Sequence, residues 1–313
     1  MSLLVVGSVA LDNLETPMGK REGIVGGAAP FICLAGAQFV KPVRLVGVIG
    51  DDFPQAMLDR LEAAGVDLEG LQRKAGQKSF SWTGKYHDDM NGRDTLATDL
   101  NVLADFDPVL PEGYRDSEYV MLGNLTPSVQ ARVLDQLTAP KLVALDTMNF
   151  WMDIALDDLK AVLKRIDVLL INDEEARQLS GERTLVKAAE AVLAMGPKYL
   201  VIKKGEHGAL LFHGEQVFFA PALPLAEVYD PTGAGDTFAG GFMGFLAGQD
   251  TVDFEMMKRA VVFGSALASF TCEDFGTDRL VDVDRAELDV RAGDFLELVR
   301  FDLKHEAEDL AGH

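Results

Sequence analysis

The chain has 313 residues, of which 48% are hydrophobic and 25% are charged, and this balance excludes wholesale disorder. Its formal net charge of −21 excludes a general nucleic-acid surface and disfavours docking on anionic lipid. It leaves room for a small anionic ligand, because a local anion site can sit inside an acidic protein.

The N-terminus and the cysteines indicate the compartment. The first residues lack a basic segment, and Asp12 ends the apolar stretch too early for a signal peptide. No window approaches about 18 uninterrupted apolar residues, so we expect no membrane partner. Cys33 and Cys272 stand in apolar surroundings outside any Cys-x-x-Cys pair, which favours free thiols over a bridge. We expect a cytoplasmic protein.

The first third of the chain alternates strands and helices. The apolar run Leu3–Val9 predicts a strand, and a helical pattern runs from Gly26-Gly27 to about Val40. A second strand is predicted over Val43–Val48 and a helix over Phe53–Ala64.

The stretch from about Gly76 to Asp107 differs from its surroundings. Alternate positions carry Phe80, Trp82, Gly84 and Tyr86, and Asn91-Gly92 is a strong hairpin signal. The residues after this turn are mostly polar. We therefore predict a small antiparallel insertion that is not part of a parallel sheet.

Strands and helices alternate again after this insertion. The predicted strands are Tyr119–Leu122, Leu142–Leu145, Val168–Ile171 and Tyr199–Ile202. The predicted helices lie near 127–137, 155–164, 174–180 and 184–195, followed by a hairpin over Ala209–Phe219 and helices over 235–247, 253–270 and 284–298. This order predicts an α/β fold with a mostly parallel sheet covered by helices on both faces. Ligands of such folds bind beyond the carboxyl ends of the strands.

One loop carries the strongest chemical signal, Asp230-Pro231-Thr232-Gly233-Ala234-Gly235-Asp236-Thr237-Phe238. Gly233 and Gly235 allow successive backbone N–H groups to point one way at a helix N-terminus, which makes an anion hole. Asp236 would repel a bound phosphate there unless it accepts a proton from an attacking hydroxyl. Taken alone, the segment also fits a tight turn with Asp236 as a helix cap.

Other catalytic motifs are absent from the sequence. It contains no P-loop and no Gly-x-Ser-x-Gly elbow, and its five histidines form no metal-ligand cluster. Phe238 stands where a dinucleotide fingerprint needs its third glycine.

Four motifs together resemble the ribokinase-like (PfkB) carbohydrate kinase family. The segment from Asp230 to Phe238 resembles its second signature nearly residue for residue, and Gly26-Gly27 with Val46–Asp52 resembles the first. Asn172-Asp173-Glu174-Glu175 matches the family's Asn-x-x-Glu, and Lys204-Gly205-Glu206-His207-Gly208 resembles its nucleotide-side loop. The resemblance covers nearly the whole chain and implies a single domain, 1–313, of ribokinase-like fold.

The resemblance implies a kinase that uses ATP and Mg²⁺. Asp236 would be the catalytic base, and Gly233, Ala234 and Gly235 would form the anion hole around the transferred phosphoryl group. Asn172 and Glu175 would place Mg²⁺ and the phosphates, Glu175 through water. The nucleotide-binding residues would be Lys204, Gly205, Gly208, Val228, Gly264 and Ala268; for Gly264 and Ala268, ordinary helix packing is the alternative. Asp230 and Thr232 are candidates for a monovalent cation, K⁺.

The resemblance also indicates the acceptor side. Asp12 would bind substrate hydroxyls, and Gly27 would let the backbone approach the substrate. The insertion 76–107, with a further candidate segment at 14–25, resembles the family's β lid, which covers the sugar and in some members joins a homodimer. Trp82 and Tyr86 would face the substrate, line an apolar lid face or form a dimer contact.

Two departures from the family concern the substrate. Phe31 stands where many members have an asparagine that meets the sugar, so we expect it either at the pocket, disfavouring free ribose, or in the core. The family's Asp-x-Asn appears here as Asp146-Thr147-Met148-Asn149, with one extra residue. Asn124 and Asn149 are therefore candidates for the missing polar contacts.

The sequence thus predicts an ATP-dependent phosphotransferase acting on a hydroxyl of a small sugar or polyol. A nucleoside kinase on the same fold is the alternative, with Phe31 or Trp82 as a wall for the base. A catalytically silent ligand-binding protein is the alternative from a different class, and an intact Asp236 argues against it.

Overall fold

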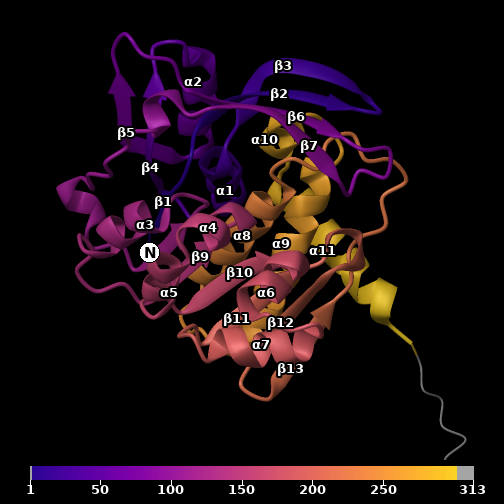
Figure 1. Cartoon of the computed structure of the whole chain (residues 1–313). Helices are drawn as coiled ribbons and strands as arrows, with labels where there is room; N and C mark the ends of the chain where they lie inside the picture. Colours follow the sequence, from indigo (N-terminus) through magenta and orange to yellow (C-terminus); the bar gives the residue numbers. More distant parts are fainter. Residues whose placement is uncertain (1, 302–313) are drawn as a thin grey trace, which may run out of the picture.

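A computed structural model describes residues 2–301 of the chain. Its centre is a sheet of nine strands, which runs through the middle of the molecule (Figure 1). The strands lie in the order β13-β12-β11-β10-β9-β8-β1-β4-β5. Neighbouring strands from β5 to β11 run parallel, whereas β12 pairs antiparallel with both β11 and β13. Their bounds are Leu3–Val6 (β1), Val43–Gly50 (β4), Val66–Lys74 (β5), Tyr119–Leu122 (β8), Leu142–Asp146 (β9), Val168–Asn172 (β10), Tyr199–Lys203 (β11), Ala209–His213 (β12) and Gln216–Ala220 (β13).

Helices cover both faces of this sheet, which confirms the predicted α/β architecture (Figure 1). One face carries α1 (Ala28–Gly36), α2 (Gln55–Ala64), α8 (Ala234–Ala247), α9 (Phe254–Thr271), α10 (Asp278–Asp282) and α11 (Arg285–Val299). The other carries α3 (Pro127–Leu134), α4 (Asn149–Ile154), α5 (Leu156–Leu163), α6 (Asp173–Ser180) and α7 (Leu185–Leu193). No helix among residues 2–301 is long and apolar enough to cross a membrane.

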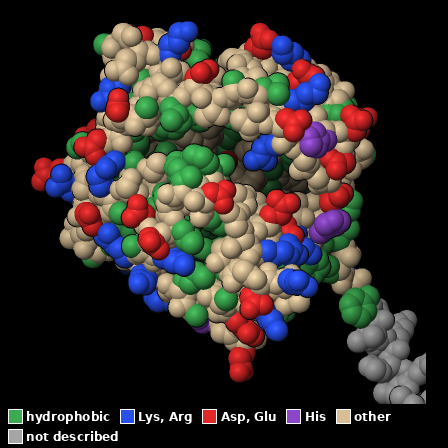
Figure 2. Space-filling view, in the orientation of Figure 1, with side chains coloured by type: hydrophobic (Ala, Val, Ile, Leu, Met, Phe, Trp, Pro, Cys, Tyr) green, Lys and Arg blue, Asp and Glu red, His purple; other side chains and the backbone are tan. Residues whose placement is uncertain are grey.

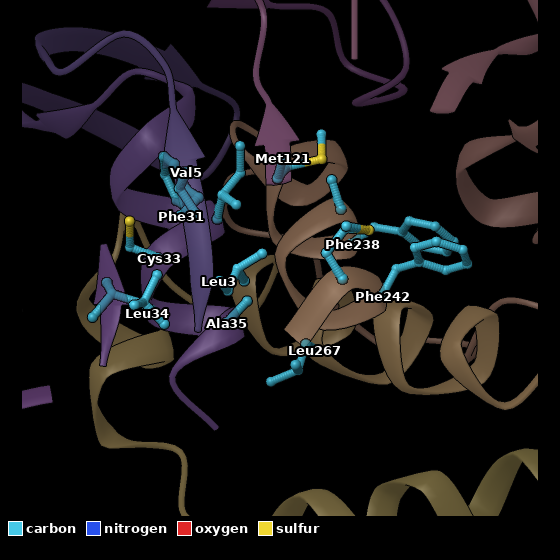
Figure 3. Close-up of a cluster of buried hydrophobic side chains, with 14 of the residues drawn as sticks. Leu3, Val5, Phe31, Cys33, Leu34, Ala35, Met121, Phe238, Phe242 and Leu267 are labelled. Atoms are coloured by element: carbon cyan, nitrogen blue, oxygen red, sulfur yellow. The ribbon is translucent and has the colours of Figure 1, made fainter. Parts of the chain in front are cut away.

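Strand β1 shows how the sequence fills two cores. Its side chains alternate between the faces, so Leu3 and Val5 join the core under α1 and α8, while Leu4 and Val6 join the other. A strand buried on both faces is therefore apolar at every position. Figure 3 shows the first of these cores, where α1 and α8 bring together residues distant in the sequence.

Helices α1 and α8 pack unusually closely, because glycines stand where they cross. A Cβ added at Gly240 would lie 2.3 Å from the carbonyl oxygen of Ile32, and one at Gly244 would lie 2.6 Å from the Cα of Gly36. Any larger residue would force the helices apart. This contact fixes the start of α8 relative to the N-terminal part of the chain.

A second sheet of four strands lies beyond the carboxyl ends of the main sheet, at the top of Figure 1. Its order is β3-β2-β6-β7, with bounds Gly19–Gly26 (β3), Ala10–Thr16 (β2), Phe80–Tyr86 (β6) and Arg93–Asp99 (β7). The predicted hairpin is present as the antiparallel pair β6 and β7 on either side of Asn91-Gly92. However, β2 pairs in parallel with β6, so the sheet is larger than the predicted insertion and is not purely antiparallel.

Several predicted elements were wrong in extent. The first strand ends at Val6 rather than Val9, and the helix predicted from Gly26 begins at Ala28, because residues 10–26 form β2 and β3. Sequence patterns also missed β5, α4 and α10. Strand β5 is an edge strand with widely spaced buried positions, and α4 and α10 each span only one to two turns, so none shows a clear period.

Candidate active site

The loop before α8 has the geometry predicted for an anion hole. Gly233 has φ of 76°, in the left-handed region, and it is the residue from which α8 starts. Ala234, Gly235 and Asp236 form the first turn. The Ala234 N–H donates to the Pro231 carbonyl oxygen at 3.2 Å, so the N–H groups of Gly235 and Asp236 are the ones left without a backbone acceptor among the described residues. The helix dipole adds positive potential at this point. The segment can therefore hold a phosphate group.

Phe31 lies beneath this loop rather than at an open pocket. Its ring is only 1% exposed, and a Cβ added at Gly233 would come within 2.5 Å of it. The structure thus supports the core alternative for Phe31, because α1 packs against α8 and turns the ring inward. Phe31 packs against Gly233 and so supports the loop from beneath, while a direct contact of the ring with the substrate stays a prediction.

Asp236 is a half-buried carboxylate in the first turn of α8. Burial, followed by the charge of Asp146, raises its pKa to about 7, although Lys203 and Arg93 lower it. A pKa near neutrality suits a group that must accept a proton and release it again.

Lys203 and Asp146 form an ion pair that sequence analysis did not assign to the site. Lys203 ends β11 and Asp146 ends β9, and the lysine Nζ lies 2.9 Å from the carboxylate Oδ2. Burial alone would lower the pKa of Lys203. The negative charges of Asp146 and Glu175 have a larger combined effect, so the pKa of Lys203 is raised. The available signal was the Lys203-Lys204 doublet, of which the resemblance pointed only to Lys204.

Asn172 and Glu175 hold each other at the start of α6. The Asn172 side chain accepts the Glu175 N–H at 2.8 Å, and the Glu175 carboxylate accepts the Asn172 N–H at 2.8 Å. This reciprocal pair is a capping box. Burial, and then Asp146, raise the pKa of Glu175 to about 7. The capping box therefore fixes a buried carboxylate at the carboxyl end of β10.

A cavity of about 100 Å³ lies beside the start of α8 and brings together most of the predicted nucleotide residues. Its lining comprises Lys203, Lys204, Gly205, Gly208, Ala209, Ala234, Gly235, Phe238, Ser265 and Ala268. Gly264 lies instead at the crossing of α8 and α9, where an added Cβ would be 2.7 Å from the Phe238 carbonyl oxygen. Val228 is half-buried in the preceding loop and is not part of the lining. Phe238 and Ser265 were not predicted.

Asp12 is a buried carboxylate where β2 meets β6. It accepts the Trp82 N–H at 3.3 Å, and it fills the space that a Cβ on Gly26 would need. Burial raises its pKa to about 7, while the N–H groups of Trp82 and Gly27 lower it. The charge of Asp12 also contributes to the raised pKa of Asp236.

Asn124 and Asn149 differ in their surroundings. The Asn124 side chain accepts the Trp151 Nε1–H at 2.8 Å and donates to the Met148 sulfur at 3.1 Å. Asn149 instead donates to Gln178 on α6. The ring of Trp151 packs edge-on against Phe150, with centroids 4.9 Å apart, and Phe150 is 49% exposed. Phe150 and Trp151 therefore form an aromatic surface on α4, just after β9, at the carboxyl edge of the main sheet.

Asp230 and Thr232 order the loop that leads to Gly233. The fully buried Asp230 carboxylate accepts N–H groups of Thr232 at 2.9 Å and Gly276 at 3.0 Å. The Thr232 hydroxyl donates to the Tyr86 hydroxyl at 3.0 Å, which links the loop to β6. Burial raises the pKa of Asp230.

These groups meet at the carboxyl edge of the main sheet, below the second sheet. Figure 2 shows the surface hollowed there, with a basic side chain inside the hollow and hydrophobic side chains on one rim. The donor set fits a nucleotide: a helix N-terminus, an ammonium group and a small cavity lined by Gly205 and Gly208. Among residues 2–301 no three acidic, His or Cys side chains gather as a metal site. Mg²⁺ needs no such group, since it is bound by one or two carboxylates plus phosphates.

Comparison of the chain with known proteins agrees with this geometry. Residues 8–283 match the model of the pfkB family carbohydrate kinases. The chain belongs to this family. It is therefore an ATP-dependent phosphotransferase that acts on a hydroxyl of a sugar or nucleoside.

Several relatives were found. The cytidine kinase of Thermococcus kodakarensis is 32% identical over 249 residues, covering 78% of this chain and 87% of that protein. The nucleoside kinase of Methanothermobacter thermautotrophicus is 26% identical over 296 residues, covering 88% and 90%. An E. coli protein described as a ribokinase II, crystallised with ATP and Mg²⁺, superposes with a TM-score of 0.77 at 19% identity over 94% of this chain and 99% of that one.

Proposed function

We propose that this kinase phosphorylates a hydroxyl of a nucleoside, with ATP as donor and Mg²⁺ as cofactor. The observation that carries the proposal is the half-exposed aromatic pair Phe150 and Trp151 beside Asn124. A nucleobase needs an apolar wall and a polar edge contact, and aromatic rings provide stacking. A free sugar offers only a smaller C–H face to such a ring. The cytidine and nucleoside kinases among the relatives support this choice over the sugar or polyol expected from the sequence.

In this proposal each predicted site residue at the carboxyl edge of the sheet has a role in the reaction. Asp12 holds substrate hydroxyls, and Asp236 accepts the proton of the attacking hydroxyl. The amides of Gly233–Gly235 stabilise the negative charge that develops on the transferred group. Asn172 and Glu175 would hold Mg²⁺, which would neutralise phosphate charge when bound.

The second sheet is the lid in this proposal, with strands from 76–107 and from the segment that includes 14–25. Its strand β6 holds Asp12 through the Trp82 N–H and reaches the phosphate loop through Tyr86. A cover tied to both the acceptor side and the phosphate side can exclude water from the reaction. On this view the domain predicted over 1–313 is one unit with an attached lid; Met1 and residues 302–313 lie outside the described residues.

The test is ADP release measured over a panel of nucleosides, free sugars and polyols. We expect the lowest KM for a nucleoside, and a Phe150→Ala variant should raise that KM about tenfold. Phe219→Ala is the matched control, because Phe219 is 51% exposed but lies on β13, at the far edge of the sheet.

A lower KM for free sugars or polyols than for any nucleoside would refute the nucleoside assignment and support the carbohydrate alternative. An unchanged nucleoside KM in the Phe150 variant would remove the aromatic pair from the base site.

We propose further that K⁺ activates the enzyme through the Asp230 loop. The buried Asp230 carboxylate has no ion-pair partner among residues 2–301, so a cation would offset the cost of its charge. Thr232 orders the same loop. Rates in KCl should exceed those in choline chloride at equal ionic strength; equal rates would exclude this role.

We also propose that the protein is cytoplasmic and that it forms a homodimer through the lid. The face of the second sheet carries a groove of about 310 Å³ that is lined by Asn13, Leu14, Glu15, Lys20, Glu22, Thr83, Gly84 and Leu96, and Leu96 is 60% exposed. The free thiols Cys33 and Cys272 suit a reducing compartment. Sedimentation of wild type and Leu96→Glu tests the dimer: a monomeric wild type would exclude it.

A further inference from the structure

Lys203 occupies an unusual electrostatic position. A Cβ added at Gly235 would lie 3.2 Å from the lysine Nζ, so the ammonium group sits against the first turn of α8. Helix N-termini carry positive partial charge, and a cation there is unfavourable unless an anion balances it. In the structure Asp146 is that anion, with side-chain exposures of 16% for Lys203 and 9% for Asp146.

The same ammonium group faces the predicted phosphate site. Lys203 lines the cavity with Gly205, Gly208 and Gly235, the residues expected to meet nucleotide phosphates. A phosphate bound there would satisfy both the helix N-terminus and the lysine. Asp146 would then lose its partner and lie next to Glu175, another carboxylate.

We propose that Lys203 binds the terminal phosphates of ATP and that Asp146 is its partner only while the nucleotide site is empty. Asp146 thus competes with the nucleotide for one ammonium group. The inference rests on the proposed use of ATP but not on the identity of the acceptor.

The first experiment measures nucleotide binding by calorimetry, without acceptor and with EDTA to remove divalent metal. Lys203→Met should weaken ATP and ADP binding about 10- to 100-fold, the range for a lost charge-assisted contact, and should change AMP binding less than about twofold. Lys198→Met is the matched control: it removes a lysine that lies just before the other end of β11 and should change none of the three affinities.

The second experiment uses Asp146→Asn under the same conditions. Removal of the competing carboxylate should tighten ADP binding about threefold to tenfold. Lys203→Arg keeps the charge and should bind ADP more tightly than Lys203→Met. Melting curves identify a variant that does not fold.

Unchanged ADP affinity in Lys203→Met, or equal weakening of AMP and ATP, would overturn the proposal. Weaker ADP binding in Asp146→Asn would do the same, because Asp146 would then support the nucleotide rather than compete with it. These binding measurements contain no acceptor, so their outcome does not depend on whether the enzyme phosphorylates a nucleoside. The proposal for Lys203 and the proposal of a nucleoside substrate can therefore fail independently.

Discussion

Two lysine–aspartate pairs lie at opposite edges of the same sheet. At the amino edge, Lys198 lies 2.8 Å from Asp167; at the carboxyl edge, Lys203 lies 2.9 Å from Asp146. Both lysines have raised pKa values. The distances alone do not tell the pairs apart.

Their surroundings differ in every respect that matters for function. Lys198 is 68% exposed, and Asp167 also accepts the Val143 N–H, so this pair ties strand ends together at the surface. Lys203 is largely buried beside a helix N-terminus and among Asp146, Glu175 and Asp236. Exposed pairs contribute about 0–1 kcal/mol to stability. The burial and the neighbouring charges of an ion pair, rather than its N···O distance, therefore indicate its role.

The largest effect should come from removing the proposed base at the carboxyl edge. We expect Asp236→Asn to lower kcat about 10²- to 10⁴-fold, because the amide cannot accept the hydroxyl proton. ADP affinity should stay within about threefold. Steady-state kinetics and calorimetry measure both. Asp167→Asn, at the amino edge, should keep kcat within about twofold; a comparable loss in that variant would break the distinction between the edges.

The pH profile should separate the two lysines. Because burial and Asp146 raise the pKa of Asp236 to about 7, activity should fall about tenfold per pH unit below that value as the base becomes protonated. Lys203 lowers this pKa, so Lys203→Met should move the acidic limb to higher pH. Lys198→Met should leave the limb in place. A limb that does not move in Lys203→Met would show that its charge does not reach the base.

Phe31 lies beneath the anion loop at the carboxyl edge of the sheet, so its replacement tests how firmly that loop is held. Phe31→Leu should destabilise the protein by about 1–2 kcal/mol, because a buried ring under Gly233 loses packing. It should also lower kcat, since the anion loop would be held less firmly. Urea unfolding and kinetics on the same preparation measure both. Loss of stability with unchanged kcat would show that the ring supports the core but not the loop.

The smallest effect concerns stability against pH. Asp12, Glu175 and Asp236 each have a pKa raised to about 7, above the values of 3.8 to 4.5 for free side chains. The folded state therefore binds more protons than the unfolded state between about pH 4 and 7, and stability falls as pH rises through that window. We expect a melting temperature about 2–4 °C lower at pH 8 than at pH 5.5. Asp236→Asn should reduce this difference, whereas Asp167→Asn should not; equal curves at both pH values would contradict the raised pKa values.

The part of the site that is local in sequence was predictable. The segment from Asp230 to Phe238 contains its own turn, helix start and carboxylate, so its local geometry could be read from its own residues, although Tyr86 and Gly276 also hold the loop in the folded protein. The same holds for Asn172 and Glu175, which form a capping box three residues apart.

The parts that depend on tertiary pairing were not predictable. Lys203 and Asp146 meet only because β9 and β11 both flank β10, and nothing in either segment encodes the other. The helical pattern around Phe31 did not decide which side faces α8. The segment 14–25 was a candidate part of the lid from the resemblance, but its parallel pairing through β2 with β6, about 70 residues later in the chain, is not encoded in either segment.

The close contact of α1 with α8 has a consequence during protein synthesis. Ile32 and Gly240, which touch across this contact, are separated by roughly 200 residues, and a ribosome adding about 5–20 residues per second needs on the order of 10–40 s to make that stretch. Throughout this interval the face of α1 that packs against α8 lacks that partner, although β1 and β4 can already contact the helix, and the phosphate loop does not yet exist. The emerging chain must therefore keep its first helix from aggregating until the last quarter of the protein arrives to cover it.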